Sequence, residues 1–281
     1  MTNNKTIYYV KPLTNGITIL KSIGGWTDSL KNLNIMYDII SFVVKGENQQ
    51  YQFISPVNYY KQNWQKRKIR NVEFVFPKSH TFNVKKADSL IKLVKKLEIE
   101  WRLKPIEIEY IFTDTYDEIQ SARGFIYSIG LGNRDKPSGI SNDVDNIIYS
   151  AGNGENYFHE FVHVYLNRLH PKSPLNEGLA VYYGGSMGKP LKWHIQRLKN
   201  YLNNHKEIDL NKYDDFGYLD NFTNPDSAIK GMLCNIVFKK DGMIGLKRLA
   251  AYESMDEVFE KEFKFDLKNL NKELRELINR Q

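Results

Sequence analysis

The chain has 281 residues, of which 41% are hydrophobic and 13% aromatic, enough for the packed core of one large domain, with or without an extension. Its 40 Lys and Arg against 33 Asp and Glu give a net charge of +7, an excess too modest for a dedicated nucleic-acid binder, so no nucleic-acid partner is expected. The single cysteine, Cys234, excludes an internal disulfide and a cysteine zinc cluster and is expected to be a small buried residue.

No apolar run is long enough for a transmembrane segment. The N-terminus MTNNKTIYYVKP lacks the apolar region of a signal peptide. The compartment therefore stays open: periplasmic or extracellular if a signal has been trimmed, and otherwise cytoplasmic. The oligomeric state is not indicated either.

Residues 1–67 are expected to form an N-terminal extension, whose role the sequence does not reveal. Residues 16–22 and 51–55 are typical of short strands. Apolar residues between them recur at helical spacing and predict an amphipathic helix over 29–44: Leu30, Leu33, Met36, Ile40 and Val43. The basic cluster Lys61 to Arg70 favours a solvated helix or linker over a contact with an anionic polymer or membrane.

Residues 68–281 are expected to form the main domain, in which strands and helices first alternate. Strands are predicted over 71–77, 106–112, 124–131 and 146–150, and helices over 84–101 and 116–122. Residues 132–141 are rich in Gly, Pro and Asn and are expected to form a loop. Only helices follow the fourth strand, so the pattern predicts an α+β fold with a small mixed sheet followed by a helical half.

The helical half opens with HEFVH, in a helix expected to begin near Asn153-Gly154-Glu155. Four residues turn a helix by about 400°, so His159 and His163 lie one turn apart on one face and can bind one ion. Glu160 lies on the flank of that face, too offset to be a ligand but well placed for a water molecule held by the ion. The alternative, a pair of partly exposed helical histidines, is weakened because this pattern is expected by chance roughly 0.01 times in such a chain.

A second helix follows within SPLNEGLAVYYGG. Ser173 can cap it, Pro174 suits its first position, and Gly184-Gly185 can end it. The short connection HPKS folds this helix back beside the first, which can bring the Glu177 carboxylate to the two imidazoles. Two histidines, a carboxylate and a water molecule complete a tetrahedral zinc site with an open position, whereas a lone Glu would otherwise be a surface charge.

HEFVH followed by NEGLA resembles the gluzincin zinc metallopeptidases, and most closely the compact peptidase-MA-like domains, over roughly residues 70–281. The resemblance implies a zincin-like fold, with a mixed-sheet N-terminal lobe, an active-site helix and a helical C-terminal lobe. It implies one catalytic Zn²⁺ bound by His159, His163 and Glu177, with Glu160 as the catalytic base. It also implies that residues 124–131 are the edge strand that pairs with an extended substrate.

Gluzincins commonly add a Tyr or His that steadies the oxyanion, and NPDSAIKGMLCN, where it would be sought, contains neither. Tyr218, just before it, is the remaining candidate, because Tyr182 and Tyr183 are turned away from the face of Glu177. The other four histidines are expected to have surface or capping roles, with His194 to be compared with the metal site: His80, His170, His194 and His205.

The leading hypothesis is a zinc endopeptidase that acts on peptide or protein substrates. The first alternative is a zincin-fold module with weak or no catalysis that binds peptides or cell-surface components. The second is a basic interaction protein that acts through the cluster Lys61 to Arg70. The sequence does not predict the cleavage specificity, because no residue of the loop 132–141 indicates which substrate side chain is recognised.

Overall fold

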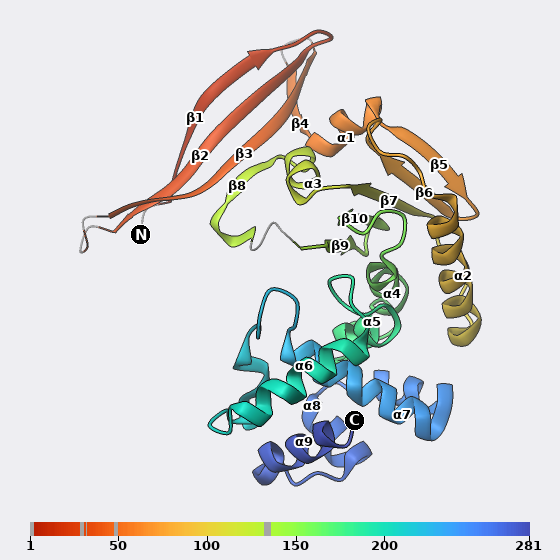
Figure 1. Ribbon diagram of the computed structural model, residues 1–281. Helices are drawn as coiled ribbons and strands as arrows, with labels where there is room; N and C mark the ends of the chain where they lie inside the picture. Colours follow the sequence, from red (N-terminus) through yellow and green to blue (C-terminus); the bar gives the residue numbers. More distant parts are fainter. Residues whose placement is uncertain (1–2, 29–30, 32, 48–49, 132–135) are drawn as a thin grey trace.

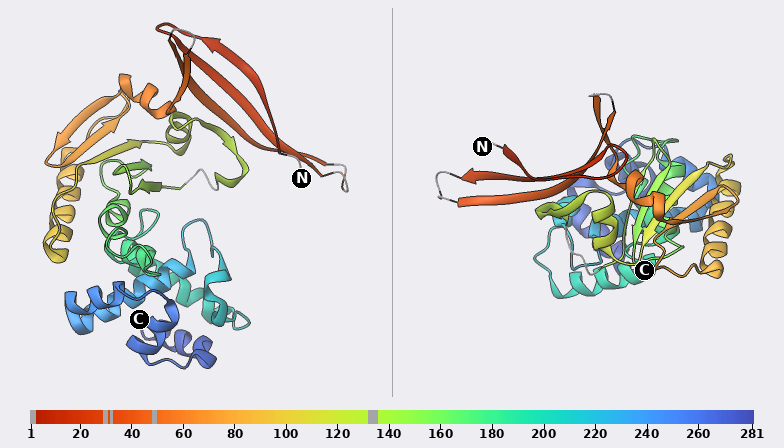
Figure 2. Two further views of the ribbon diagram at one scale, coloured as in Figure 1. Left: turned by 180° about the vertical axis from the view of Figure 1, so that it is seen from behind. Right: turned by 90° about the horizontal axis from the view of Figure 1, so that it is seen from above.

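The computed structural model describes residues 3–28, 31, 33–47, 50–131 and 136–281 (Figure 1). Its described strands form two five-stranded sheets, and the fold is mixed α+β. The N-terminal sheet projects away from the body, whereas the C-terminal helices gather beneath the second sheet, on the side away from this projection (Figures 1 and 2). The mixed fold class predicted from the sequence is confirmed at this level.

The N-terminal sheet consists of four consecutive antiparallel strands and one strand from later in the chain. These are β1 (Asn3–Pro12), β2 (Ile17–Asp28), β3 (Leu33–Glu47), β4 (Gln50–Ile54) and β8 (Phe125–Ser128), which pairs with β3. The helix predicted over 29–44 is wrong where residues are described. The segment 33–44 is rich in Ile, Val and Phe, which favour a strand, and β2 offers a partner along almost its whole length.

The second sheet is mixed and carries the site. Its strands lie in the order β5 (Gln65–Ile69), β6 (Val72–Phe76), β7 (Ile108–Thr113), β10 (Ile147–Ala151) and β9 (Ser138–Asn142). β6, β7 and β10 are parallel to one another, and antiparallel β5 and β9 close the two edges. The strands predicted over 71–77, 106–112 and 146–150 are confirmed.

Two predictions fail at the edges of this sheet. The basic segment expected to be a solvated helix or linker forms β5 from Gln65 onward, after α1 (Pro56–Tyr60) and one 3-10 turn. Part of the loop expected over 132–141 forms β9, while 132–135 lie outside the described residues. Both edge strands are short and polar, so they depend on pairing with an apolar neighbour rather than on their own pattern.

Helices cover both faces of the second sheet. α2 (Val84–Trp101) and α3 (Tyr116–Ala122) occupy the predicted ranges. α2 packs on the face that presents Phe74 and Tyr110, and α3 packs on the opposite face against Ile111. The alternation of these side chains along β7 explains how one strand contributes to two cores.

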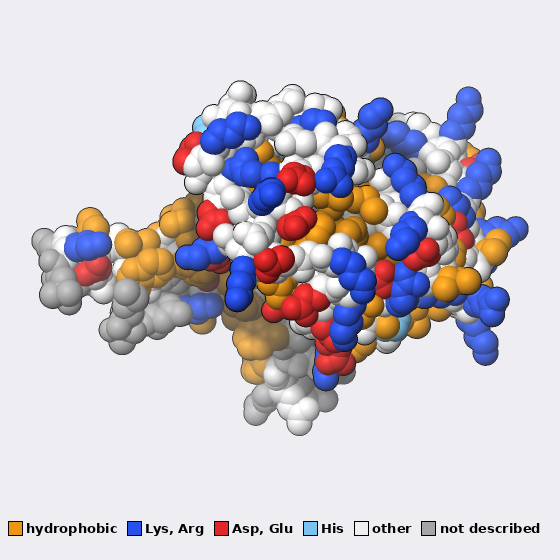
Figure 3. All heavy atoms as spheres, turned by 90° about the horizontal axis from the view of Figure 1, so that it is seen from below, with side chains coloured by type: hydrophobic (Ala, Val, Ile, Leu, Met, Phe, Trp, Pro, Cys, Tyr) orange, Lys and Arg blue, Asp and Glu red, His pale blue; other side chains and the backbone are white. Residues whose placement is uncertain are grey.

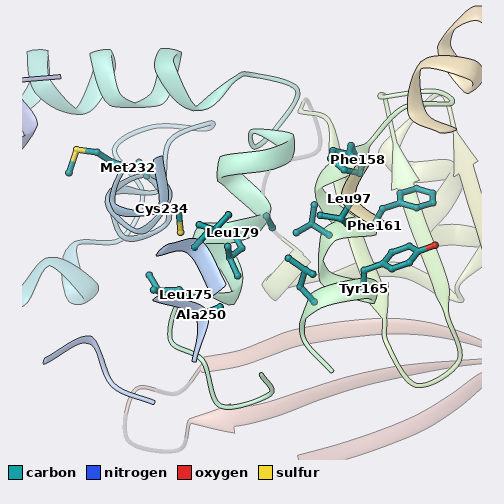
Figure 4. Packing of buried hydrophobic residues seen from close by; sticks show 14 of the residues in the cluster. Leu97, Phe158, Phe161, Tyr165, Leu175, Leu179, Met232, Cys234 and Ala250 are labelled. Atoms are coloured by element: carbon teal, nitrogen blue, oxygen red, sulfur yellow. The ribbon is translucent and has the colours of Figure 1, made fainter. Parts of the chain in front are cut away.

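The helical half consists of α4 (Phe158–Leu166), α5 (Asn176–Gly184), α6 (Leu191–Asn204), α7 (Pro225–Ala250), α8 (Met255–Glu257) and α9 (Leu270–Asn279). The described chain also contains 3-10 helices at Lys61–Asn63, Ile129–Leu131, Leu210–Phe216 and Leu267–Asn269, and a π-helix at Val258–Phe263. One apolar core runs from Phe161 of α4 through Leu179 of α5 to Cys234 of α7, which confirms the buried cysteine (Figure 4). Among the described helices none is long and apolar enough to cross a membrane.

The expected boundary after residue 67 lies inside β5, and β8 returns the chain to the N-terminal sheet. The division into residues 1–67 and 68–281 stays a prediction. The topology places the site where β10 leads into α4. The edge strand β9 lies next to β10 at this point.

Candidate functional site

α4 is the helix that carries the histidine pair, and it begins later than predicted. Its cap is Tyr157, not a residue of Asn153-Gly154-Glu155. Gly152 and Gly154 have φ values of 73° and 63°, left-handed conformations that end the strand-to-helix turn and that glycine adopts without strain. Eight of the nine residues of α4 are buried, so the histidine pair lies on a core helix rather than on a surface helix.

Three side chains converge between α4 and α5: His159, His163 and Glu177. Nε2 of His159 lies 3.1 Å from Nε2 of His163, and Oε2 of Glu177 lies 3.2 Å from the latter nitrogen. Oε1 of Glu177 lies 3.5 Å from Nε2 of His159. One ligand atom from each residue lies within 4.8 Å of the others, so this group could hold a metal ion.

The second nitrogen of each imidazole is already engaged. Nδ1 of His159 lies 2.6 Å from the carbonyl oxygen of Gly185, which can only accept a hydrogen bond. Nδ1 of His163 lies 3.2 Å from Oδ1 of Asn167, whose amide nitrogen donates to Asp143 at 2.7 Å. Each neutral imidazole therefore carries its proton on Nδ1, and the two Nε2 lone pairs face each other. Two lone pairs at this separation repel unless a cation, either a proton or a metal ion, lies between them.

The carboxylate of Glu177 supplies the matching negative charge. Burial lowers the pKa of His163, but the hydrogen bond and charge of Glu177 outweigh it and raise the value to about 9. The pKa of His159 is raised by the same balance. Burial raises the pKa of Glu177, yet the two imidazoles reverse the effect and hold it well below its usual range. The cluster thus favours positive charge among its three side chains.

Glu160 lies at the same site without joining the cluster. Its side chain is buried, and burial raises the pKa of its carboxyl, opposed by the two histidines. The edge strand β9 passes directly over it, because a Cβ added to Gly139 would lie 2.8 Å from Cγ of Glu160. The carboxyl of Glu160 therefore binds a proton more tightly than a free glutamate does, and it lies beside the group that could hold an ion.

α5 brings Glu177 into place through two glycines. A Cβ on Gly178 would lie 2.6 Å from Cβ of Lys230 on α7, and one on Gly184 would lie 2.5 Å from the backbone nitrogen of His159. α5 therefore approaches both α7 and the start of α4 closely. It begins at Asn176, not at the predicted Ser173-Pro174, while Gly185 is its C-cap as predicted.

The strand beside the site is not the one expected. Residues 124–131 were predicted to be the edge strand, but β8 within them pairs with β3 of the N-terminal sheet. β9 is one of the two edge strands of the second sheet, and it is the one that contacts α4. β8 therefore belongs to the other sheet, and whether it pairs with a substrate stays a prediction. β9 was not predicted as a strand, because its sequence, SGISN, has no apolar alternation.

Tyr218 lies on the approach to α7 and is half exposed. Burial raises the pKa of its hydroxyl, and so does the negative charge of Glu177, which places the phenol within electrostatic reach of the cluster. Tyr183 points away as predicted, since its hydroxyl donates to Glu100 of α2.

Two of the remaining histidines differ from the prediction. His194 is buried, bonded to Thr223 and to the carbonyl of Ser186, and burial lowers its pKa, so it is neither a surface residue nor part of the cluster. His80 is not a surface residue either, because it lies between Asp114 and Glu155.

The basic cluster of residues 61–70 is largely neutralised. Four of its five cations form ion pairs at 2.6–3.5 Å with glutamates of neighbouring elements: Lys61 with Glu109, Lys66 with Glu73, Lys68 with Glu107 and Arg70 with Glu98. On the underside of the molecule, Lys and Arg side chains are scattered with Asp and Glu among them (Figure 3). These pairs weaken the case for a basic interaction protein.

Asn167 and Asp143 were missed by the sequence reasoning. Asn167 could have been found, because it follows His163 by four residues and so lies on the same helical face. Asp143 could not, since its contact depends on how the turn after β9 folds over α4.

The sequence matches no protein-family model and no curated protein, and the fold matches no solved structure.

Proposed function

We propose that this protein is a zinc-dependent peptidase with a gluzincin-type site and a zincin-like arrangement of its sheet and helices. The observation that carries the proposal is the pair of Nε2 lone pairs at 3.1 Å, fixed by acceptors on both Nδ1 atoms and faced by the Glu177 carboxylate. A pair of histidines that merely packed in a core would have no reason to present both lone pairs to one point.

The donor set fits zinc in kind and in spacing. A tetrahedral zinc with bonds of about 2.0–2.1 Å separates its ligand atoms by roughly 3.3 Å. The separations of 3.1, 3.2 and 3.5 Å between His159, His163 and Glu177 are close to that value. Three protein ligands leave one position open, which is typical of catalytic rather than structural sites.

Zinc bound there supplies a Lewis acid that polarises a carbonyl and lowers the pKa of a water molecule towards about 7. Glu160 accepts the proton of the attacking water and delivers it to the leaving amine, a role that suits its buried position and raised pKa. Tyr218 is the candidate donor to the carbonyl oxygen as that oxygen gains negative charge.

β9 offers a surface for the substrate. It is an edge strand, and its Gly139 lies against Glu160 without a side chain between them. An extended peptide that adds to this edge brings its backbone past the catalytic carboxylate.

The substitution Glu160→Gln tests the proposal. It keeps the size of the side chain and leaves His159, His163 and Glu177 unchanged, so the variant should bind zinc as the wild type does. Removal of the proton acceptor should lower cleavage of an unfolded protein by about 10²-fold or more. Zinc content is measured by metal analysis, cleavage is measured with and without chelator, and exposed Glu260→Gln serves as the control.

Full activity in Glu160→Gln, or a wild type that binds no zinc, would overturn the proposal. A wild type that binds zinc and peptides but never cleaves them would instead support the alternative of a non-catalytic binding module. The burial of Glu160 beside the cluster argues against that alternative, because a purely structural metal site has no need of this carboxylate.

A further inference from the structure

A pocket of about 330 Å³ lies at the edge of the second sheet, on the side of α3. Its wall includes Tyr149 of β10 and Gly139 of β9. Gly139 also lies against the ring of Tyr157 and against Glu160, so β9 has the pocket beside it and the proposed catalytic carboxylate against the same glycine. The volume is at the lower end of the range for ligand sites and suits one side chain or one chain terminus.

Two cations line this pocket, Arg123 at the end of α3 and Lys136 before β9. The Arg123 guanidinium lies 5.0 Å from the ring centre of Tyr149 and 5.4 Å from that of Phe125, and it donates to Gln120 at 3.2 Å. Nζ of Lys136 lies 4.6 Å from the ring centre of Tyr218, the tyrosine whose pKa is raised in part by the charge of Glu177. The aromatic rings hold both cations in place without neutralising them.

Neither cation has an ion pair with a carboxylate of the described residues, and the pocket wall contains no Asp or Glu among them. Burial lowers the pKa of Arg123 and of Lys136, and for Lys136 it outweighs the opposing negative charge of Asp220, which forms its own ion pair with Arg197. Arg123 donates to the neutral amide of Gln120 but to no carboxylate of the described residues, and its remaining donors form a fork that matches a carboxylate.

A peptide that pairs with β9 would have side chains that can reach this pocket. A peptide that adds to a sheet edge continues the sheet, so its successive side chains point alternately to the two faces. One set faces α4 and the cluster, and the other set faces α3, where Arg123 lies. A residue next to the scissile bond on the peptide can therefore reach the pocket while its backbone passes Glu160.

We propose that this pocket binds a carboxylate of the peptide substrate through Arg123 and Lys136 and so gives the enzyme a preference for acidic peptides. The proposal rests on the proposed peptidase function and on peptide pairing with β9. The carboxylate comes either from an Asp or Glu side chain or from the C-terminus of the peptide.

The test measures peptide binding separately from cleavage. Extended, acetylated fluorescent peptides carry a single Glu or a single Gln at each position in turn, with a free or an amidated C-terminus. Binding to zinc-loaded Glu160→Gln is measured by fluorescence anisotropy, alone and combined with Arg123→Gln, Arg123→Lys or the exposed control Lys172→Gln. The same peptides are then offered to the wild type for cleavage.

A charged hydrogen-bonded pair predicts about tenfold or more tighter binding of the acidic peptide than of its neutral twin. Arg123→Gln should abolish that ratio, Arg123→Lys should restore part of it, and Lys172→Gln should leave it intact. A preference for internal Glu assigns the carboxylate to a side chain, and a preference for the free end assigns it to the C-terminus.

Equal binding of acidic and neutral peptides, no peptide binding at all, or a preference that survives Arg123→Gln would overturn the inference. Acidic preference in binding without cleavage by the wild type would leave the pocket supported and place the failure in the proposed catalysis. Cleavage that does not depend on the charge of the peptide would support the proposed catalysis and overturn the inference about the pocket.

Discussion

Nδ1 of His163 points away from the cluster, and its hydrogen bond leaves the lone pair of Nε2 free to face the cluster. Its Nδ1 donates to Asn167, and Asn167 in turn donates to Asp143. A carboxylate at the end of such a chain orients the imidazole and increases its basicity. His159 receives a weaker version of this support, because the carbonyl of Gly185 is neutral.

Asn167→Ala should therefore weaken binding of the proposed zinc, while the three proposed ligands remain. Loss of an outer hydrogen-bond partner typically lowers metal affinity by about 10–100-fold. Competition with a chelator of known affinity measures the change in zinc affinity. Asn200→Ala, which removes an exposed amide bonded to Gln196 on α6, is the matched control. An affinity within about twofold of the wild type would show that Asn167 does not orient His163.

The residues of the cluster could be predicted because each of their relations is local. The separation of His159 and His163 is one helical turn, and Glu177 follows after a short turn into the next helix. Arg123 and Asp143 could not be found in this way. Their roles depend on α3 and on the turn after β9, which the fold brings to the site from outside the motif.

At the scale of elements, α5 is held against its neighbours more tightly than a side chain at Gly178 would allow. The Cβ of alanine there would lie 2.8 Å from the backbone carbonyl carbon of Lys230 as well as 2.6 Å from its Cβ, and backbone cannot rotate aside. α5 must then shift away from α7, and Glu177 on the same turn must shift with it.

Gly178→Ala should cost about 1–3 kcal/mol of unfolding free energy, the usual range for overpacking in a core. It should also weaken zinc binding, although the substitution changes no ligand. Denaturant unfolding and chelator competition measure the two effects. Gly130→Ala is the control, because its Cβ would meet nothing closer than 3.8 Å. A variant as stable as the wild type would mean that α5 and α7 adjust without strain.

Elements were predictable where one strong local pattern agrees with the tertiary contacts. α2 and α3 have an apolar stripe and a capping side chain, and both lie where they were predicted. β3 carries apolar residues at both helical and alternating spacing, so only its pairing with β2 decides the outcome. β9 is polar and short, and it exists as a strand because β10 provides its hydrogen bonds.

At the scale of the whole molecule, one end of the second sheet joins the parts that form the site. The loops that follow β6, β7 and β10 meet there, and each leads into a helix. His80 joins all three, with Nδ1 2.7 Å from Oδ1 of Asp114 and Nε2 2.9 Å from Oε1 of Glu155. Glu155 is 1% exposed and lies four residues before His159. The contact of His80 with Glu155 therefore helps to position the segment that leads into α4.

This histidine should make the stability of the whole fold depend on pH. Burial lowers the pKa of His80, but the hydrogen bonds and charges of Glu155 and Asp114 outweigh it, and the pKa is raised above 6.5. A raised pKa in the folded state means that the folded state binds the proton more tightly than the unfolded state. The stabilisation is therefore complete below about pH 6.5 and is lost as the pH rises through the folded-state pKa.

His80→Gln should remove that dependence. The difference in unfolding free energy between wild type and variant, measured by denaturant from about pH 6 to about pH 9 in excess zinc, should be largest at the acidic end and shrink as the pH rises. His205→Gln, at the partly exposed end of α6, controls for the loss of a histidine. A constant difference across this range would mean that His80 stabilises the loops without its charge, and a difference that grows with pH would contradict the sign of the shift.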